Sequence, residues 1–112
     1  MTEQLKKSLM LSLKTIVDTG MASKIILFGS VAKGGDQPDS DIDLCVLTPI
    51  TDKRPRNITV DLRRKLWGVK KSPLDLLTYN QERFAYHASR DRSFESIIDK
   101  GLFFMKESLD FT

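Results

Sequence analysis

The feature that most constrains the fold is the segment Asp41 to Leu47, in which acidic and apolar residues alternate. Successive side chains of an extended strand point to opposite faces, so Ile42, Leu44 and Val46 share one face. The acids Asp41 and Asp43 then lie together on the other face, with Cys45 and Leu47. A strand with one apolar face needs a hydrophobic layer against it. We therefore predict an α/β (α+β) fold, with a small mixed sheet and helices packed mainly on one face.

Apolar residues at helical spacing predict three helices. The first covers residues 3–18 and ends before Gly20. The second follows the Pro-containing linker 48–57, with its apolar stripe at Ile58, Leu62 and Leu66 and its end at Gly68. For the third, near the C-terminus, we expect a longer stripe: Phe94, Ile97, Ile98, Leu102 and Met105.

Two more apolar runs, at residues 24–30 and 73–79, predict a first and a third strand on either side of the acidic one. Gly29 and Ser30 end the first strand, whereas Asp41 and Asp43 begin the second. These groups meet only if the two strands are antiparallel. Asp75 lies near the start of the third strand, after a 25-residue connection that is long enough for a parallel crossover. Three acids are then expected at one edge of the sheet.

Acids placed so close together need positive charge beside them. Two unit charges ~6 Å apart repel by roughly 3 kcal/mol at an effective dielectric constant of ~20, and Asp75 adds to the repulsion. Carboxylate oxygens bind hard divalent cations, and Mg²⁺ in particular keeps coordination positions open for phosphate oxygens. Asp41, Asp43 and Asp75 are therefore candidate ligands for two Mg²⁺ ions, an arrangement that catalyses phosphoryl or nucleotidyl transfer.

The Gly29-Ser30 pair is the candidate phosphate-binding element. Glycine lets the backbone approach a phosphate closely, and the serine hydroxyl and following N–H groups can donate hydrogen bonds to its oxygens. Lys33 adds a positive charge three residues later. Either the Gly-Ser pair or the acidic pair alone carries little information, but together they favour a nucleoside triphosphate site.

These residues resemble the signature of a known superfamily. Gly29-Ser30, ten residues and then Asp41-Ile42-Asp43 are similar to the pattern of the nucleotidyltransferases that include DNA polymerase β and kanamycin nucleotidyltransferase. The likeness is greatest to the minimal nucleotidyltransferases and extends over FGSVAKG, PDSDIDLCVL, PLDLLTY and the final predicted helix. Lys33 departs from the pattern, because arginine is common there. Lysine keeps the charge but not a bidentate grip on phosphate.

The resemblance implies a DNA polymerase β-like fold and Mg²⁺-dependent transfer of a nucleoside monophosphate, AMP from ATP above all. Asp41 and Asp43 would hold both metals, and Asp75 would hold the catalytic metal and help to deprotonate the acceptor hydroxyl. Gly29, Ser30 and Lys33 would bind the nucleotide. Small members of this family often act as the antitoxin of a toxin–antitoxin pair beside a helical HEPN protein, and some transfer AMP to a tyrosine of that partner.

Length and composition limit the number of domains, the location and the binding partners that we expect. At 112 residues we expect a single nucleotidyltransferase domain over 1–112. Four-residue apolar runs exclude a membrane-spanning helix, and one cysteine with no continuous apolar leader favours a cytoplasmic protein. A net charge of +3 is too small to indicate nucleic-acid binding, which we do not expect. The segment from Lys53 to Lys71 contains eight basic residues and one acidic residue. Such a segment is typical of a solvated helix face; alternatively, it attracts an NTP, an RNA or an acidic partner.

Two other functions stay open at this point. The chain can be a transferase for a small molecule such as an aminoglycoside, in which case a homo-oligomer or a partner would complete the acceptor pocket. It can also be a non-catalytic antitoxin that neutralises its partner by occlusion. The acceptor, the preferred nucleotide and the oligomeric state are not specified by these residues.

Overall fold

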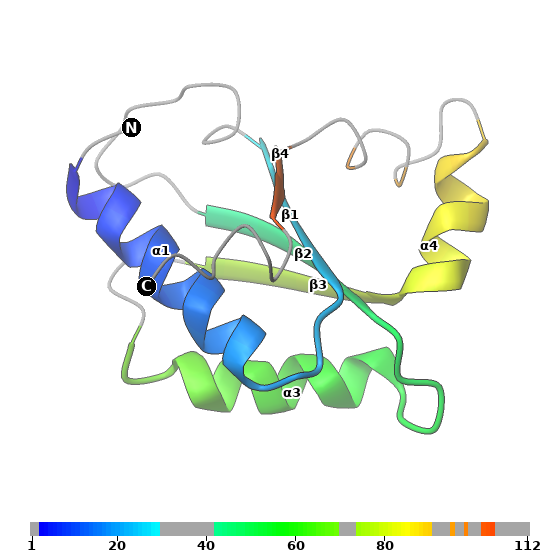
Figure 1. Cartoon of the computed structure of the whole chain (residues 1–112), viewed down its shortest axis with the longest axis horizontal. Helices are drawn as coiled ribbons and strands as arrows, with labels where there is room; N and C mark the ends of the chain where they lie inside the picture. The colour runs from blue at the N-terminus through cyan, green and yellow to red at the C-terminus, as the bar shows by residue number, and fades with distance from the viewer. Residues whose placement is uncertain are drawn as a thin grey trace.

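The computed structural model describes residues 3–29, 42–69 and 74–90, residues 95 and 98, and the backbone of 102–104 (Figure 1). Its elements are, in chain order, α1 (Glu3–Asp18), β1 (Lys24–Phe28), β2 (Ile42–Thr48), α3 (Pro55–Leu66), β3 (Leu74–Asn80), α4 (Gln81–Ala88) and β4 (Leu102–Phe104). Among the described helices, none is long and apolar enough to cross a membrane.

The strands form one mixed sheet in the order β3-β2-β1-β4. β1 and β2 are antiparallel, and β2 and β3 are parallel and joined through α3, as the positions of the polar residues predict. Phe28 at the end of β1 pairs with Asp43 on β2, and Asp43 pairs with Asp75 on β3. The end of β1 and the starts of β2 and β3 therefore lie side by side.

α1 and α3 cover the same face of the sheet (Figure 1). Under them lies the main core, to which the sheet contributes Ile25, Leu27, Ile42, Leu44, Val46 and Leu76, and the helices contribute Leu5, Leu9, Leu13, Ile16, Ile58, Leu62 and Leu66. The predicted alternation of β2 is confirmed, since Ile42, Leu44 and Val46 are at most 1% exposed on this face. Pro55 begins α3, where its missing N–H removes no hydrogen bond.

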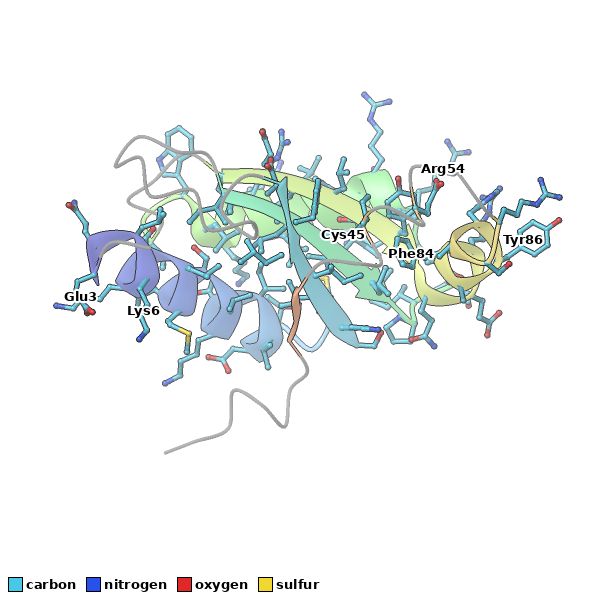
Figure 2. All side chains as sticks on the ribbon, turned by 90° about the horizontal axis from the view of Figure 1, so that it is seen from above. Glu3, Lys6, Cys45, Arg54, Phe84 and Tyr86 are labelled. Carbon is cyan, nitrogen blue, oxygen red and sulfur yellow. The ribbon has the colours of Figure 1, made fainter. Side chains whose placement is uncertain are left out.

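The opposite face carries a smaller core made of Ile26, Cys45, Leu47, Phe84 and Ile98. Phe84 comes from α4, which follows β3 directly and which the apolar periodicity does not predict. Asn80 caps this helix, because its side chain accepts hydrogen bonds from the backbone N–H groups of Glu82 and Arg83. Figure 2 shows Cys45 in the middle of the sheet and Phe84 where α4 meets the sheet.

The predicted final helix is wrong at its C-terminal end. Leu102–Phe104 form β4, which is antiparallel to β1 and pairs Ile26 with Phe103. Ile25, Ile26 and Leu27 are almost fully buried, so their backbone groups need partners on both sides of the strand. Gly101 interrupts the helical pattern, and the following Leu-Phe-Phe sequence suits a strand.

One buried polar atom in α1 is expected to cost stability. Ser12 is 1% exposed, and its Oγ has no hydrogen-bond partner among the described residues. We expect Ser12→Ala to raise the free energy of unfolding by about 1 kcal/mol, because it removes a buried hydroxyl that has no partner. Urea unfolding measures this change. Ser8→Ala is the matched control one turn earlier, because Ser8 is equally buried but has a polar contact, and a gain of the same size there would contradict the explanation.

Burial also makes Cys45 unreactive. Desolvation, with a smaller effect from the charge of Glu95, raises the pKa of this thiol from 9.0 to about 12. The rise lowers the thiolate fraction near pH 8 by about a thousandfold, so we expect a thiol reagent to label the native chain far more slowly than the urea-unfolded chain. A Cys45→Ala, Gln4→Cys double variant, with its thiol on the exposed start of α1, should label quickly. Equal native rates for the two chains would contradict the assignment.

Candidate active site

Two of the predicted acids, Asp43 and Asp75, are direct neighbours in the sheet. They form a register pair on the parallel strands β2 and β3, so their Cα atoms lie about 4.8 Å apart and their side chains point to the same face. That face is the one that Cys45 also shares. Asp43 is half-buried and Asp75 is exposed, so the pair lies where the core ends and solvent begins.

Gly29 contacts the carboxylate of Asp43 directly. It follows β1 with a φ of +79°, a conformation that residues with a side chain rarely adopt. A Cβ atom at this position would lie 2.1 Å from Oδ2 of Asp43, well inside van der Waals contact. The backbone at the end of β1 can therefore approach this acid so closely only because residue 29 is glycine.

Three of the six predicted site residues are thus brought together: Gly29, Asp43 and Asp75. The other three, Ser30, Lys33 and Asp41, lie outside the described residues and stay predictions. In the sequence Ser30 follows Gly29, and Asp41 is two positions before Asp43, which is the distance between side chains on the same face of a strand.

The donor set of the site fits a divalent cation. Asp43 and Asp75 provide carboxylate oxygens, the ligands that Mg²⁺ prefers, and at least one of them is open to solvent. The parallel strands hold these two negative charges next to each other, which costs free energy unless positive charge is nearby. Within the described residues no three metal-ligating side chains cluster, and the predicted third ligand, Asp41, is not among those residues.

A cleft of about 280 Å³ opens beside Asp75. β3 contributes Leu74, Asp75 and Leu76 to its walls, and α3 contributes Arg63, Leu66 and Trp67. Sequence reasoning did not assign Arg63 or Trp67 to the site. The signal available was their place at the end of the α3 stripe, next to Leu66, within the basic segment from Lys53 to Lys71.

Comparison with known proteins gave one family. Residues 9–99 match the Nucleotidyltransferase domain family. No curated protein and no solved structure matched the chain. The matched segment contains β1, β2, β3 and α3, and with them Gly29, Asp43 and Asp75. Its helices and mixed sheet are consistent with the DNA polymerase β-like fold. Because the match covers most of the sequence, the chain belongs to the nucleotidyltransferase domain family and is a transferase of nucleotidyl groups.

Proposed function

We propose that this chain transfers AMP from ATP to a hydroxyl group of a partner protein. The observation that carries the proposal is the register of the sheet, which pairs Asp43 with Asp75 and places the backbone of Gly29 against Asp43. A carboxylate pair beside a glycine turn is the arrangement needed to hold a metal-bound triphosphate next to a base.

The metal ligands in this proposal are Asp41, Asp43 and Asp75. Magnesium bound there, as two ions, supplies the positive charge that favours an ionised acceptor hydroxyl and a leaving pyrophosphate. Asp43 faces the site from β2 and Asp75 from β3, and Asp41 is two positions before Asp43 in the sequence. Asp43 is half-buried, which restricts its side chain, whereas Asp75 is exposed and accessible to an incoming acceptor.

The chain's own groups then divide the remaining tasks. Gly29, with the Ser30 hydroxyl and Lys33, binds the triphosphate. Asp75 accepts the proton of the acceptor hydroxyl, whose oxygen attacks the α-phosphorus. The new O–P bond replaces the bond to the β-phosphate oxygen, and pyrophosphate leaves with the electron pair of the broken bond. ATP and a protein hydroxyl thus give an adenylylated protein, pyrophosphate and one proton.

A protein acceptor is favoured by the openness of the site. β3 is the outer strand of the sheet on the side of Asp75, so among the described elements no further strand encloses this acid. A small molecule would leave much of such a site uncovered, whereas a protein surface would cover it. We propose a helical HEPN-type toxin as the partner, with the chain as its antitoxin and one of its tyrosines as the acceptor. A cytoplasmic location accords with the free, buried Cys45.

The carboxylates are tested by replacing each with its neutral amide. We expect Asp43→Asn and Asp75→Asn to reduce transfer by about a hundredfold or more, because each loses a metal ligand and Asp75→Asn also loses the base. The measurement is transfer of label from α-phosphate-labelled ATP with Mg²⁺ into protein of the source cell. Asp18→Asn is the matched control, since Asp18 is exposed at the end of α1.

Each outcome of this experiment has a definite meaning. A band labelled by the parent and the control but not by the site variants supports the proposal and gives the mass of the acceptor. Full transfer by Asp43→Asn would contradict the metal assignment. No labelled protein with the parent, although Mg-ATP binds, would contradict a protein acceptor and favour a small molecule or a non-catalytic antitoxin.

The glycine turn is tested by a matched pair of alanine substitutions. Gly20 and Gly29 have nearly the same positive φ, +75° and +79°, so alanine should cost each about 1 to 2 kcal/mol in stability. A Cβ at position 20 meets nothing within 4 Å, whereas a Cβ at position 29 displaces the Asp43 carboxylate. We expect Gly29→Ala to lose transfer and Gly20→Ala to keep it, as measured by the same label assay on folded protein. Equal activity of the two variants would show that the close approach is not needed.

A further inference from the structure

Trp67 is the most exposed of the large apolar side chains that the structure describes. It directly follows α3 and is 81% exposed, although its neighbour Leu66 is 1% exposed in the main core. It is the only tryptophan of the sequence. An indole left in water costs free energy, and exposed aromatic side chains of this size are typical of surfaces that bind partners.

Trp67 belongs to a continuous surface on α3. Val60, Arg63, Arg64 and Trp67 recur at the spacing of one helix face, opposite the buried Ile58, Leu62 and Leu66, and together line a shallow hollow of about 430 Å³. We call these four residues the Trp67 face. Val60 is 44% exposed, so the face has apolar area beside its two arginines.

The Trp67 face continues into the cleft along the edge strand that bears Asp75. Arg63 and Trp67 also line the cleft that contains Asp75. α3 is held against β3 by a 2.6 Å hydrogen bond from Thr59 Oγ1 to Thr78 Oγ1, and by Leu62 and Leu66 in the core shared with Leu76. The position of the face relative to Asp75 is therefore set by packing on both elements.

The charge of this surface favours an acidic partner. Arg63, Arg64 and Lys65 follow one another, and the acid nearest to them in the sequence, Asp61, forms its salt bridge with Lys53. This bridge is the main cause that lowers the pKa of Asp61, with smaller effects from the charges of Arg64 and Lys65. Within the described part of the chain, no recorded salt bridge joins Arg63 or Arg64 to an acid.

A protein segment fits this surface better than a nucleic acid does. Tryptophan and arginine are the residues most enriched at the energetic centres of protein interfaces, where apolar contact and charge-assisted hydrogen bonds combine. Val60 offers an aliphatic surface on which a base or a phosphate gains little. An acidic segment with aromatic side chains can instead pair with both arginines and cover the indole.

We propose that the Trp67 face docks an acidic, tyrosine-containing segment of the acceptor protein beside Asp75. This inference rests on the proposed function for its reaction, and it assigns the recognition of the acceptor to residues outside the signature of the family. Trp67 supplies the contact area, Arg63 and Arg64 attract the carboxylates of the segment, and the cleft between α3 and β3 brings the segment to the edge strand that bears Asp75.

Trp67 itself provides the test, because the fluorescence of this chain's only tryptophan comes from the proposed surface. The probe is a copolymer of glutamate and tyrosine, added to the full chain without ATP, with excitation beyond the tyrosine band. We expect a saturable shift of the emission to shorter wavelength. Arg63→Glu/Arg64→Glu should weaken the apparent affinity by about tenfold or more, the effect typical of interface hot spots.

A matched variant controls for overall charge. Lys6→Glu/Lys7→Glu makes the same charge change on exposed positions of α1 and should leave the affinity near that of the parent. An emission that does not respond to the copolymer, or equal weakening by both double variants, would overturn the proposal. A shift with mixed transfer RNA but not with the copolymer would overturn it in favour of a nucleic-acid surface.

Failure of the docking proposal can be distinguished from failure of the proposed nucleotidyl transfer. Docking is measured without nucleotide, so it is readable in Asp43→Asn even if no transfer takes place. Conversely, the parent and Arg63→Glu/Arg64→Glu are compared for transfer of labelled AMP to the copolymer. Transfer that is undiminished in this variant would support the proposed function while overturning the docking surface.

Discussion

The whole arrangement depends on the burial of one face of β2. Ile42, Leu44 and Val46 are covered by α1 and α3, and each fully buried aliphatic side chain of this kind contributes about 1.5 to 3 kcal/mol. The repulsion between the neighbouring carboxylates opposes this burial: two unit charges ~4 Å apart repel by about 1 kcal/mol in water and about 4 kcal/mol at an effective dielectric constant of ~20. Burial therefore outweighs the repulsion. Because side chains alternate along the strand, the register that buries the apolar residues also pairs Asp43 with Asp75.

The two ends of the sheet differ in the residues that they carry. At one end, the starts of β2 and β3 meet the glycine turn after β1, and there Asp43 is half-buried and Asp75 is exposed. At the other end, β3 passes directly into α4, where Asn80 caps the helix and the ring of Phe84 packs edge-on against Tyr79 with centroids 5.4 Å apart. This aromatic contact closes the smaller core far along the strand from Asp75. Among the described residues, no aromatic contact of this kind lies at the end of the sheet that bears the acids.

Much of the fold was predictable because its patterns are strong and local. The first helix has the predicted bounds, 3–18, since five apolar residues mark one stripe and Gly20 follows it. The antiparallel and parallel pairings followed from where Gly29, Asp43 and Asp75 lie along their strands. α4 was not predicted because a helix of eight residues with one buried aromatic side chain shows little periodicity. β4 was predicted as helix because its strand conformation depends on pairing with β1, a tertiary contact that local periodicity does not show. The exposure of Trp67 also depends on tertiary structure. Periodicity indicates on which face of the helix a residue lies, but not whether another element packs on that face.

The place of β1 inside the sheet has a consequence for biosynthesis. Its second neighbour is β4, and the register pairs Ile26 with Phe103, 77 positions later in the chain (103 − 26). During translation, β1 and β2 can pair early, but one side of β1 stays without hydrogen-bond partners until those later residues have left the ribosome. An apolar strand with such an open side readily pairs with other chains. The nascent protein is thus vulnerable to aggregation until β4 is added to the sheet.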